Sequence, residues 1–187
     1  TEPAWSADGN WIYFTSDRYN DFTAYAVNAG GGTPRRLMAH YFNTVHAVAE
    51  HPQSGAYFFT DSWESFRFAN RKRYQGDYNP DIKSWDPKTG EYKVHTTWRG
   101  KDYQPTFDRA GTLFFVSDEG NGEFNLYRLT GGKKEALTRF DTSLRMPQAS
   151  ADGRRVVFEK DYQLWIYDVA QKESRRLAIE VFRNNPL

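Results

Sequence analysis

The chain contains no cysteine. This absence excludes disulfide bridges, thiolate metal sites and a cysteine nucleophile, although it leaves the cellular compartment open. No apolar run approaches the roughly 18 residues that a membrane-spanning helix requires. No secretory signal sequence opens the chain, and residues 1–5 already have the composition of a folded domain, so we expect a processed or trimmed start.

The chain also lacks an excess of charge of either sign. Its 25 Lys and Arg residues and 24 Asp and Glu residues give a net charge of +1, and both signs are mixed along the whole length. A nucleic-acid-binding protein needs a concentrated basic stripe, so we expect no nucleic-acid partner. Long stretches with the apolar periodicity of a helix are missing as well.

Aromatic residues, in contrast, are abundant. They make up 17% of the 187 residues, with 14 Phe, 12 Tyr and 6 Trp. Large aromatic side chains favour pleated, two-sided burial, which indicates β structure. The length suffices for one core or for part of a larger one, and we therefore treat residues 1–187 as a single domain.

An internal repeat organises the chain. The segment Pro3–Gly9 (PAWSADG) returns at Pro147–Gly153 (PQASADG), and a weaker copy lies at Pro105–Gly111 (PTFDRAG). The two later copies are 42 residues apart. The remaining copy is expected at His46–Glu50, with Gly55 closing its turn.

Each copy is followed by three further extended segments. The second strands are predicted at 11–14, 56–59, 113–116 and 156–158, the third at 23–27, 81–85, 125–129 and 163–169, and the fourth at 35–38, 92–96, 135–137 and 175–179. Four short strands per unit of roughly 40 residues are typical of a β-propeller blade. We predict an all-β propeller with four four-stranded antiparallel blades at about 1–40, 41–98, 99–140 and 141–181, and a tail at 182–187.

The strand composition supports stacked sheets. Trp11–Phe14 and Leu113–Val116 do not alternate between apolar and polar residues, so both faces of these strands should be covered by neighbouring blades. A β-sandwich is the alternative, but sandwich strands lack a fixed period. Because four blades lie at the lower end of the usual range, we expect part of a larger propeller with two exposed blade faces, which missing blades or another copy of the chain would cover.

The repeat resembles a known type. Residues 3–18 and 31–37 closely resemble the WD40-like, TolB-type propeller repeat, which TolB shares with tricorn-type serine proteases and with propellers of the prolyl-peptidase group. Residues 58–64, 79–82, 100–105, 145–153 and 175–181 are most similar to the amino-terminal propeller of tricorn-like proteases. In that family the propellers admit and position peptides, and cleavage takes place in a separate domain.

This resemblance implies a non-catalytic module that binds or gates peptides for a tricorn-like serine peptidase, without a cofactor. One alternative is a TolB-like envelope scaffold that binds protein partners, and another is the propeller of a prolyl-peptidase-type hydrolase. A periplasmic or envelope location is likewise implied by the resemblance.

An insertion at 63–78 separates the second and third strands of the second unit. Long loops on a rigid scaffold often carry binding residues. The arginine and lysine side chains could attract carboxylates, and the aromatic ones offer stacking surfaces. The candidate peptide- or partner-binding residues are Trp63, Arg67, Arg71, Lys72, Arg73 and Tyr74. The alternative is a solvated elaboration that packs against a neighbouring domain.

Motifs for catalysis and metal binding do not fit. His46 and His51 have the wrong spacing from Glu50 for a zinc protease helix and lie on a predicted inner strand and its turn, so we interpret them as structural and expect no metal site. The chain has no G-x-S-x-G segment for a hydrolase nucleophile. Ser6 and Ser150 occupy repeated turn positions, where local hydrogen bonds to the backbone are expected.

One acidic position recurs at the end of the second strand. It is occupied by Asp17, Asp61 and Asp118 in the first three units. A repeated position usually serves the repeat, so we expect each carboxylate to accept hydrogen bonds from backbone amides at its own strand end.

Overall fold

The structure, a computed structural model, describes residues 1–19, 22–38 and 44–180. It confirms the predicted fold class. The described chain forms four antiparallel sheets of four strands each, and in every sheet the strands pair in chain order, as in propeller blades. No helix in the described part of the chain is long and apolar enough to cross a membrane.

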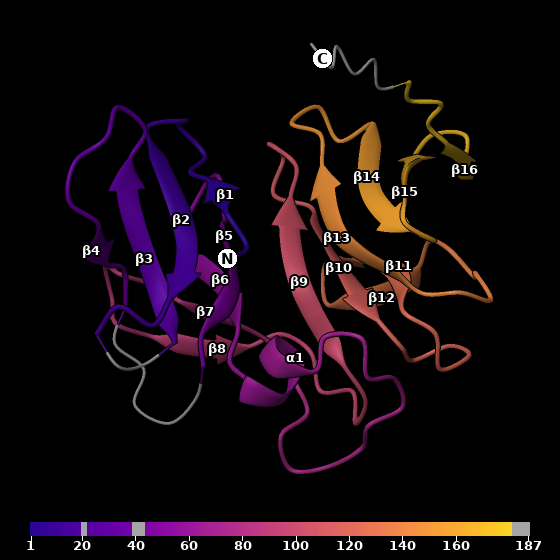
Figure 1. Cartoon of the computed structure of the whole chain (residues 1–187), viewed down its shortest axis with the longest axis horizontal. Coiled ribbons are helices and arrows are strands. Elements are labelled where there is room, and N and C mark those ends of the chain that lie inside the picture. Colours follow the sequence, from indigo (N-terminus) through magenta and orange to yellow (C-terminus); the bar gives the residue numbers. More distant parts are fainter. Residues whose placement is uncertain (20–21, 39–43, 181–187) are drawn as a thin grey trace, which may run out of the picture.

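The strands of the four blades are consecutive in the sequence (Figure 1). Blade 1 contains β1 (Ala4–Trp5), β2 (Trp11–Ser16), β3 (Thr23–Asn28) and β4 (Arg35–Arg36). Blade 2 contains β5 (His46–Glu50), β6 (Tyr57–Thr60), β7 (Ile82–Trp85) and β8 (Tyr92–Val94). Blade 3 contains β9 (Asp102–Phe107), β10 (Leu113–Ser117), β11 (Asn125–Thr130) and β12 (Lys133–Ala136). Blade 4 contains β13 (Leu144–Ala149), β14 (Arg155–Lys160), β15 (Gln163–Asp168) and β16 (Glu173–Arg176).

The repeated turns form as their sequence predicts. In the first turn the Ser6 hydroxyl accepts a hydrogen bond from the Trp11 amide (2.9 Å). In the last turn Ser150 does the same for the Arg155 amide (3.0 Å). Gly9 has a φ of 73°, a left-handed conformation that glycine adopts without steric cost. The local role predicted for the two serines is confirmed.

Three hydrophobic cores hold the blades together. Tyr13, Ala26 and Phe59 belong to the core between blades 1 and 2. Phe58, Phe115 and Tyr127 belong to the core between blades 2 and 3. The core between blades 3 and 4 is the largest and consists of Tyr103, Phe114, Val116, Phe124, Leu126, Leu144, Val156, Phe158 and Tyr167. The described residues form no fourth core between blade 4 and blade 1, so extensive packing joins only consecutive blades.

Burial along the second strands reflects this arrangement. All five residues of β10, in an interior blade, are buried, as predicted from their uninterrupted apolar sequence. In β2, Tyr13 and Thr15 are buried and the other residues are half-buried, so the two faces of Trp11–Phe14 are covered less completely than predicted. Strand β14 shows a similar alternation. The reason is that blades 1 and 4 lie at the two ends of the series and each packs against one neighbour.

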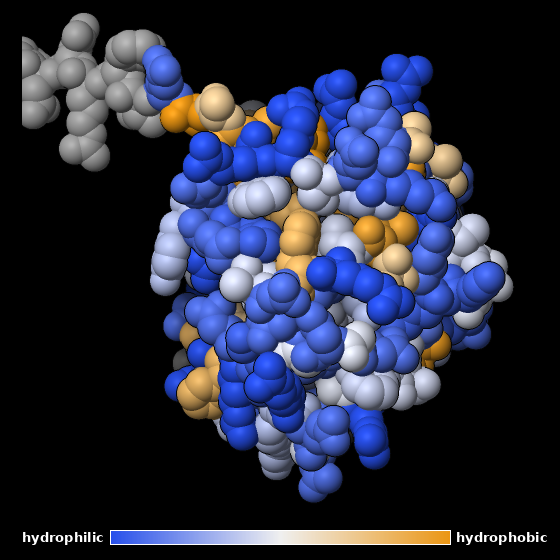
Figure 2. Space-filling model, turned by 90° about the vertical axis from the view of Figure 1, so that its right-hand side faces the viewer, coloured by the Kyte–Doolittle hydropathy of each residue, from blue (hydrophilic) through white to orange (hydrophobic). Residues whose placement is uncertain are grey.

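The free face of blade 4 is mixed in character. Figure 2 shows the side of the molecule on which blades 3 and 4 lie, where hydrophilic residues surround a few apolar ones. On the free face of blade 4, Val157 and Ile166 are paired and half-buried, and Leu164 is exposed. This face therefore lacks the continuous apolar surface of the three cores between blades.

Several predicted boundaries were wrong. The outermost strands are shorter than predicted in blades 1 and 2, and β16 begins two residues before the predicted Arg175. The outermost strands of blades 1 and 2 are short because an outermost strand pairs on one side only. In blade 4 the side chain of Asp168 accepts hydrogen bonds from the amides of Ala170 and Gln171, and this tight turn lets β16 begin early. The predicted limit near residue 40 and the tail at 182–187 lie outside the described residues.

The insertion contains a helix that the sequence did not predict. Helix α1 (Trp63–Arg67) begins after Ser62, whose side chain accepts hydrogen bonds from the amides of Glu64 and Ser65. Serine is a favoured N-cap because it satisfies amides that the first turn leaves without partners. With five residues, the helix is too short to show an apolar periodicity.

Candidate functional site

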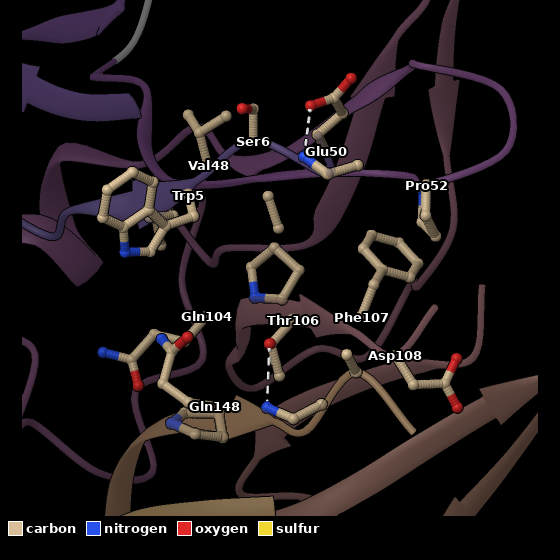
Figure 3. Close-up of a pocket in the computed structure, with 18 of the residues that line it drawn as sticks. Trp5, Ser6, Val48, Glu50, Pro52, Gln104, Thr106, Phe107, Asp108 and Gln148 are labelled. Atoms are coloured by element: carbon tan, nitrogen blue, oxygen red, sulfur yellow. Dashed lines mark hydrogen bonds between the residues drawn. The ribbon is translucent and has the colours of Figure 1, made fainter. Parts of the chain in front are cut away.

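A cavity, which we call the central cavity, lies between the innermost strands. It has a volume of about 580 Å3, and residues of β1, β5, β9 and β13 and of the turns that follow these strands line it. Figure 3 shows Trp5, Val48, Thr106 and Gln148 around this space. All four blades therefore contribute equivalent positions of the repeat to one cavity.

A backbone irregularity recurs where each inner strand reaches the cavity. Glu2, Ala47, Gln104 and Met146 all have left-handed φ values, between 51° and 56°. In β5, β9 and β13 the residue lies at a shift in strand register of the kind that a β-bulge produces. A left-handed residue other than glycine is uncommon, so its recurrence in four blades identifies it as a feature of this repeat.

Two of these residues connect adjacent blades. The Glu2 carboxylate accepts a hydrogen bond from the Ala47 amide (3.0 Å), and the Gln104 side chain accepts one from the Met146 amide (2.8 Å). The same position thus bonds blade 1 to blade 2 and blade 3 to blade 4. Ala47 has no side-chain acceptor, so this bond is not available between blades 2 and 3.

Other polar groups of the cavity wall also connect blades (Figure 3). The Glu50 carboxylate accepts hydrogen bonds from the Ala7 amide (3.0 Å) and the Tyr13 hydroxyl (2.8 Å). Burial, together with this carboxylate, raises the pKa of Tyr13. The Thr106 hydroxyl accepts a bond from the Ala149 amide (3.2 Å). These bonds hold the wall in place.

A few lining residues remain largely exposed. Trp5 is 63% exposed, and Gln148 and Arg109 are also exposed at the cavity. An indole, an amide and a guanidinium can bind a ligand by stacking and hydrogen bonding. Sequence reasoning did not identify these residues, although Trp5 and Gln148 lie within the repeated segment that revealed the blades.

The structure divides the six predicted site residues into separate groups. Lys72 and Arg73 both contact the carboxylate of Glu123 in blade 3, at 2.8 and 3.3 Å. The Arg71 guanidinium lies 4.2 Å from the Tyr74 ring centroid, in cation–π geometry. These four side chains therefore attach the distal part of the insertion to itself and to blade 3.

The other two predicted residues face solvent. Trp63 is 37% exposed, and Arg67 is exposed in the last turn of α1. The Trp63 ring lies 6.1 Å from that of Phe68 and 5.3 Å from that of Tyr78, and both neighbours are exposed. We call Trp63, Phe68 and Tyr78 the aromatic patch.

A buried ion pair lies beneath α1. The Lys101 ammonium is 2.7 Å from the Glu64 carboxylate, and both side chains are almost inaccessible. Lys101 also donates a hydrogen bond to the Phe68 carbonyl (2.9 Å). Burial lowers the pKa of Lys101 even though Glu64 acts in the opposite direction. The Tyr103 hydroxyl donates to the Ala69 carbonyl (3.0 Å), so the insertion is bound firmly to blade 3.

Glu2, His46 and Ser65 form a hydrogen-bonded series that extends from the segment before β1 to α1. His46 Nδ1 lies 3.1 Å from Glu2, and its Nε2 lies 2.7 Å from the Ser65 hydroxyl. Burial raises the pKa of Glu2, but His46 and the Ala47 amide outweigh it, so the pKa is lowered overall. The residue types match a hydrolytic triad, but Ser65 is completely buried and lines no described cavity. These three hydrogen-bonded residues therefore connect the insertion to the inner strands.

The histidines interpreted as structural have structural surroundings. His51 packs against Phe58 and Phe107, at 5.9 and 5.1 Å between ring centroids. At the opposite end of β5, His46 contacts the ring of Phe66. Within the described ranges, no group of three or more potential ligand side chains is close enough to hold a metal ion.

The recurrent aspartates differ from one another. Asp118 accepts hydrogen bonds from the amides of Lys101 and Arg73, and the second of these belongs to the insertion of the preceding blade. Asp61 pairs with the Lys83 ammonium at 2.7 Å. Asp17 is exposed. A hydrogen bond from a backbone amide of its own blade is thus observed for Asp118, with Lys101 as the donor. The bond from Arg73 additionally joins Asp118 to blade 2.

Comparisons with known proteins show similarity at the level of structure. No family profile and no curated protein matches the sequence. The structure is similar to TolB from Acinetobacter baumannii, with a TM-score of 0.76, 23% identity, and coverage of 95% of this chain and 43% of TolB. It is also similar to the tricorn protease, with a TM-score of 0.61, 15% identity, and coverage of 98% and 23% of the respective chains.

A puromycin-hydrolyzing peptidase from Mycobacterium tuberculosis is a third similar structure, with a TM-score of 0.63, 17% identity, and coverage of 96% of this chain and 31% of the peptidase. The chain thus spans less than half the length of each of these three proteins. All three identities are below 25%, where structural similarity establishes the fold alone. The chain is a β-propeller module similar in structure to TolB and to parts of two peptidases.

Proposed function

We propose that this propeller module is non-catalytic and binds extended peptide segments in its central cavity. The main support is the cavity itself, which is framed by equivalent residues of all four blades. Its volume of about 580 Å3 is within the roughly 300–1,000 Å3 of typical ligand sites. Exposed Trp5, Gln148 and Arg109 supply a stacking surface and hydrogen-bonding groups beside a fixed wall.

The similarity to two peptidases favours a role in admitting or positioning peptides for a tricorn-like serine peptidase, whose catalytic residues would lie outside this chain. The similarity to TolB favours a second candidate, in which the same cavity holds a segment of a protein partner in a TolB-like scaffold. Both candidates require binding of a chain segment in the cavity, and they differ in whether that segment is later cleaved.

A peptide array tests the shared requirement. We expect the native chain to bind a subset of immobilised decapeptides, and we expect Gln148→Trp to weaken that binding at least tenfold by filling the cavity. Gln148 is exposed, so the larger ring should leave the fold intact. Gln171→Trp is the matched control, because Gln171 is an exposed glutamine that does not line the cavity.

Absence of peptide binding, or equal binding by the Gln148→Trp and Gln171→Trp variants, would contradict the proposal. The first candidate requires a peptidase domain to act together with this chain. Incubation of bound peptides with the chain and that domain, followed by mass spectrometry, therefore separates the two candidates. Cleaved peptides indicate substrate delivery, and intact peptides indicate a scaffold.

A further inference from the structure

The insertion of blade 2 carries a second exposed surface that is separate from the central cavity. The aromatic patch of Trp63, Phe68 and Tyr78 is formed by side chains that are 37%, 47% and 49% exposed. Their ring centroids are 5.3–6.1 Å apart around Trp63, so the three rings form one continuous surface. No residue of the insertion lines the cavity. Clustered exposed aromatic rings often mark an interaction site.

The backbone beneath the aromatic patch is held in place. The Ser62 hydroxyl donates a hydrogen bond to the Tyr78 carbonyl (2.6 Å), which joins the two ends of the insertion. The Phe68 carbonyl accepts a hydrogen bond from buried Lys101. A surface that is already ordered loses little conformational entropy when a partner binds. The patch is thus suited to binding, whereas a mobile loop would first have to be ordered.

Positively charged side chains lie at the edge of the aromatic patch. Trp63 and Arg67 are four residues apart on α1, so their side chains lie on the same face of the helix. The Arg71 guanidinium lies 6.0 Å from the Phe68 ring centroid, and its side chain is half exposed. Both arginines therefore border the aromatic patch.

The carboxylates of the neighbourhood are already largely paired with other cations. Lys101 pairs with Glu64, which is 3.7 Å from Arg71 but is buried, and Lys72 and Arg73 share Glu123. Asp77 is the one exposed carboxylate within residues 63–78. The border of the aromatic patch therefore carries an excess of positive charge.

We propose that the aromatic patch, bordered by Arg67 and Arg71, binds an acidic segment of a partner protein that also carries bulky apolar side chains. The apolar side chains cover the three rings, and carboxylates pair with the two guanidinium groups, whose planar donors suit carboxylates. This proposal does not depend on peptide binding in the central cavity. It narrows the six residues predicted from the sequence to Trp63, Arg67 and Arg71, and adds Phe68 and Tyr78.

Fluorescence anisotropy with three labelled heptapeptides tests the proposal. In the first peptide Asp and Glu alternate with Leu and Phe, in the second Lys replaces both acids, and in the third Ser replaces Leu and Phe. We expect the native chain to bind the first peptide at least tenfold more tightly than the other two, and the binding to weaken as salt screens the charges.

Three substitutions locate the binding surface. Trp63→Ala, Phe68→Ala and Arg67→Ala should each weaken binding of the acidic peptide about tenfold, as loss of an interface anchor does. Tyr162→Ala and Arg154→Ala are the matched controls, because Tyr162 is 94% exposed and the Arg154 side chain is 81% exposed, both in blade 4. Thermal unfolding followed by circular dichroism verifies that each variant is folded. Arg67→Ala removes an exposed side chain, so this variant should remain informative even if Trp63→Ala unfolds.

The cavity variant Gln148→Trp should bind the acidic peptide like the native chain, so failure of the peptide array and failure of this experiment are distinguishable. Affinity weaker than about 1 mM for the acidic peptide would overturn the proposal. Equal affinity for the lysine peptide would also overturn it, as would native affinity in the folded variants.

Discussion

The side chain of Gln104 accepts a hydrogen bond from the backbone amide of Met146 at 2.8 Å, and this bond joins blade 3 to blade 4 beside the central cavity. Both residues are left-handed, with φ values of 56° and 53°. Glu2 makes the equivalent bond to Ala47. A conformation that costs energy is therefore used twice to connect the inner ends of adjacent blades.

Gln104→Met tests this connection, since methionine keeps the length of the side chain and loses the acceptor. We expect the free energy of unfolding to decrease by about 1–2 kcal/mol, because the partly buried Met146 amide is left without its partner. Chemical denaturation measures the change, and Gln148→Met, at an exposed position, should leave stability unaltered. An unchanged denaturation midpoint in Gln104→Met would mean that the bond contributes nothing.

Blade 2 offers the reverse experiment. Ala47 has the same left-handed conformation but no side-chain acceptor. Ala47→Gln should supply the missing bond to blade 3 and stabilise the fold by up to about 1 kcal/mol. The same denaturation experiment measures the gain. A loss of stability would show that the wall has no room for the longer side chain.

The buried pair of Lys101 and Glu64 should be strongly coupled. Lys101→Met leaves Glu64 charged and buried without its main partner, which typically costs about 3–5 kcal/mol. Adding Glu64→Gln to Lys101→Met should recover much of this loss because the remaining group is then neutral. The exposed pair of Lys93 and Glu91 is the control, and its removal should have no measurable effect. Equal stabilities of the single and double variants would contradict the coupling.

Much of the fold could be predicted because the information is local and repeated. The Ser6 and Ser150 turns, the β5 segment and the outline of the blades all follow from short segments that recur along the chain. A repeat unit carries its own turn chemistry, and four copies reveal which positions matter.

The candidate site could be predicted only in part, because its contacts are distant in the sequence. Lys72 and Glu123 are 51 residues apart, and Glu2 and His46 are 44 residues apart. A list of cations in the insertion could not distinguish Lys72, which is paired, from Arg67, which faces solvent. The cavity requires four separate strands to meet, so it emerges from the arrangement of the blades.

Asp81 should make stability depend on pH in one direction. Burial raises the pKa of its carboxyl group to about 6, with Thr96 opposing the shift and Asp102 adding to it. The folded state thus holds the proton more tightly than the unfolded state, so stability falls as the pH rises from about 4 to about 6.

Asp81→Asn removes this titration while its amide oxygen still accepts the bond from Thr96. Because the group is only partly buried, we expect a gain of about 1 kcal/mol at pH values above about 6, and no gain near pH 4. Thermal unfolding at both pH values checks the prediction. A variant that is less stable at both values would indicate that the carboxylate is favourable in the folded state.

His51 and His95 should produce the opposite dependence. Their rings lie on the ring of Phe58, at 5.9 and 4.4 Å between centroids. Burial lowers the pKa of both histidines, and nearby positive charge from Lys93 and from His51 lowers that of His95 further. Below the unfolded pKa of about 6.5 the unfolded chain binds protons that the folded chain resists, so stability falls as the pH decreases.

The two effects overlap near pH 6, so the histidines are best measured in the Asp81→Asn background. There we expect the urea midpoint to decrease between about pH 7.5 and about pH 5.5. Adding His51→Phe, which keeps a ring between Phe58 and Phe107 but cannot take up a proton, should reduce that decrease. An equally steep decrease with phenylalanine at this position would assign the pH dependence to groups other than His51.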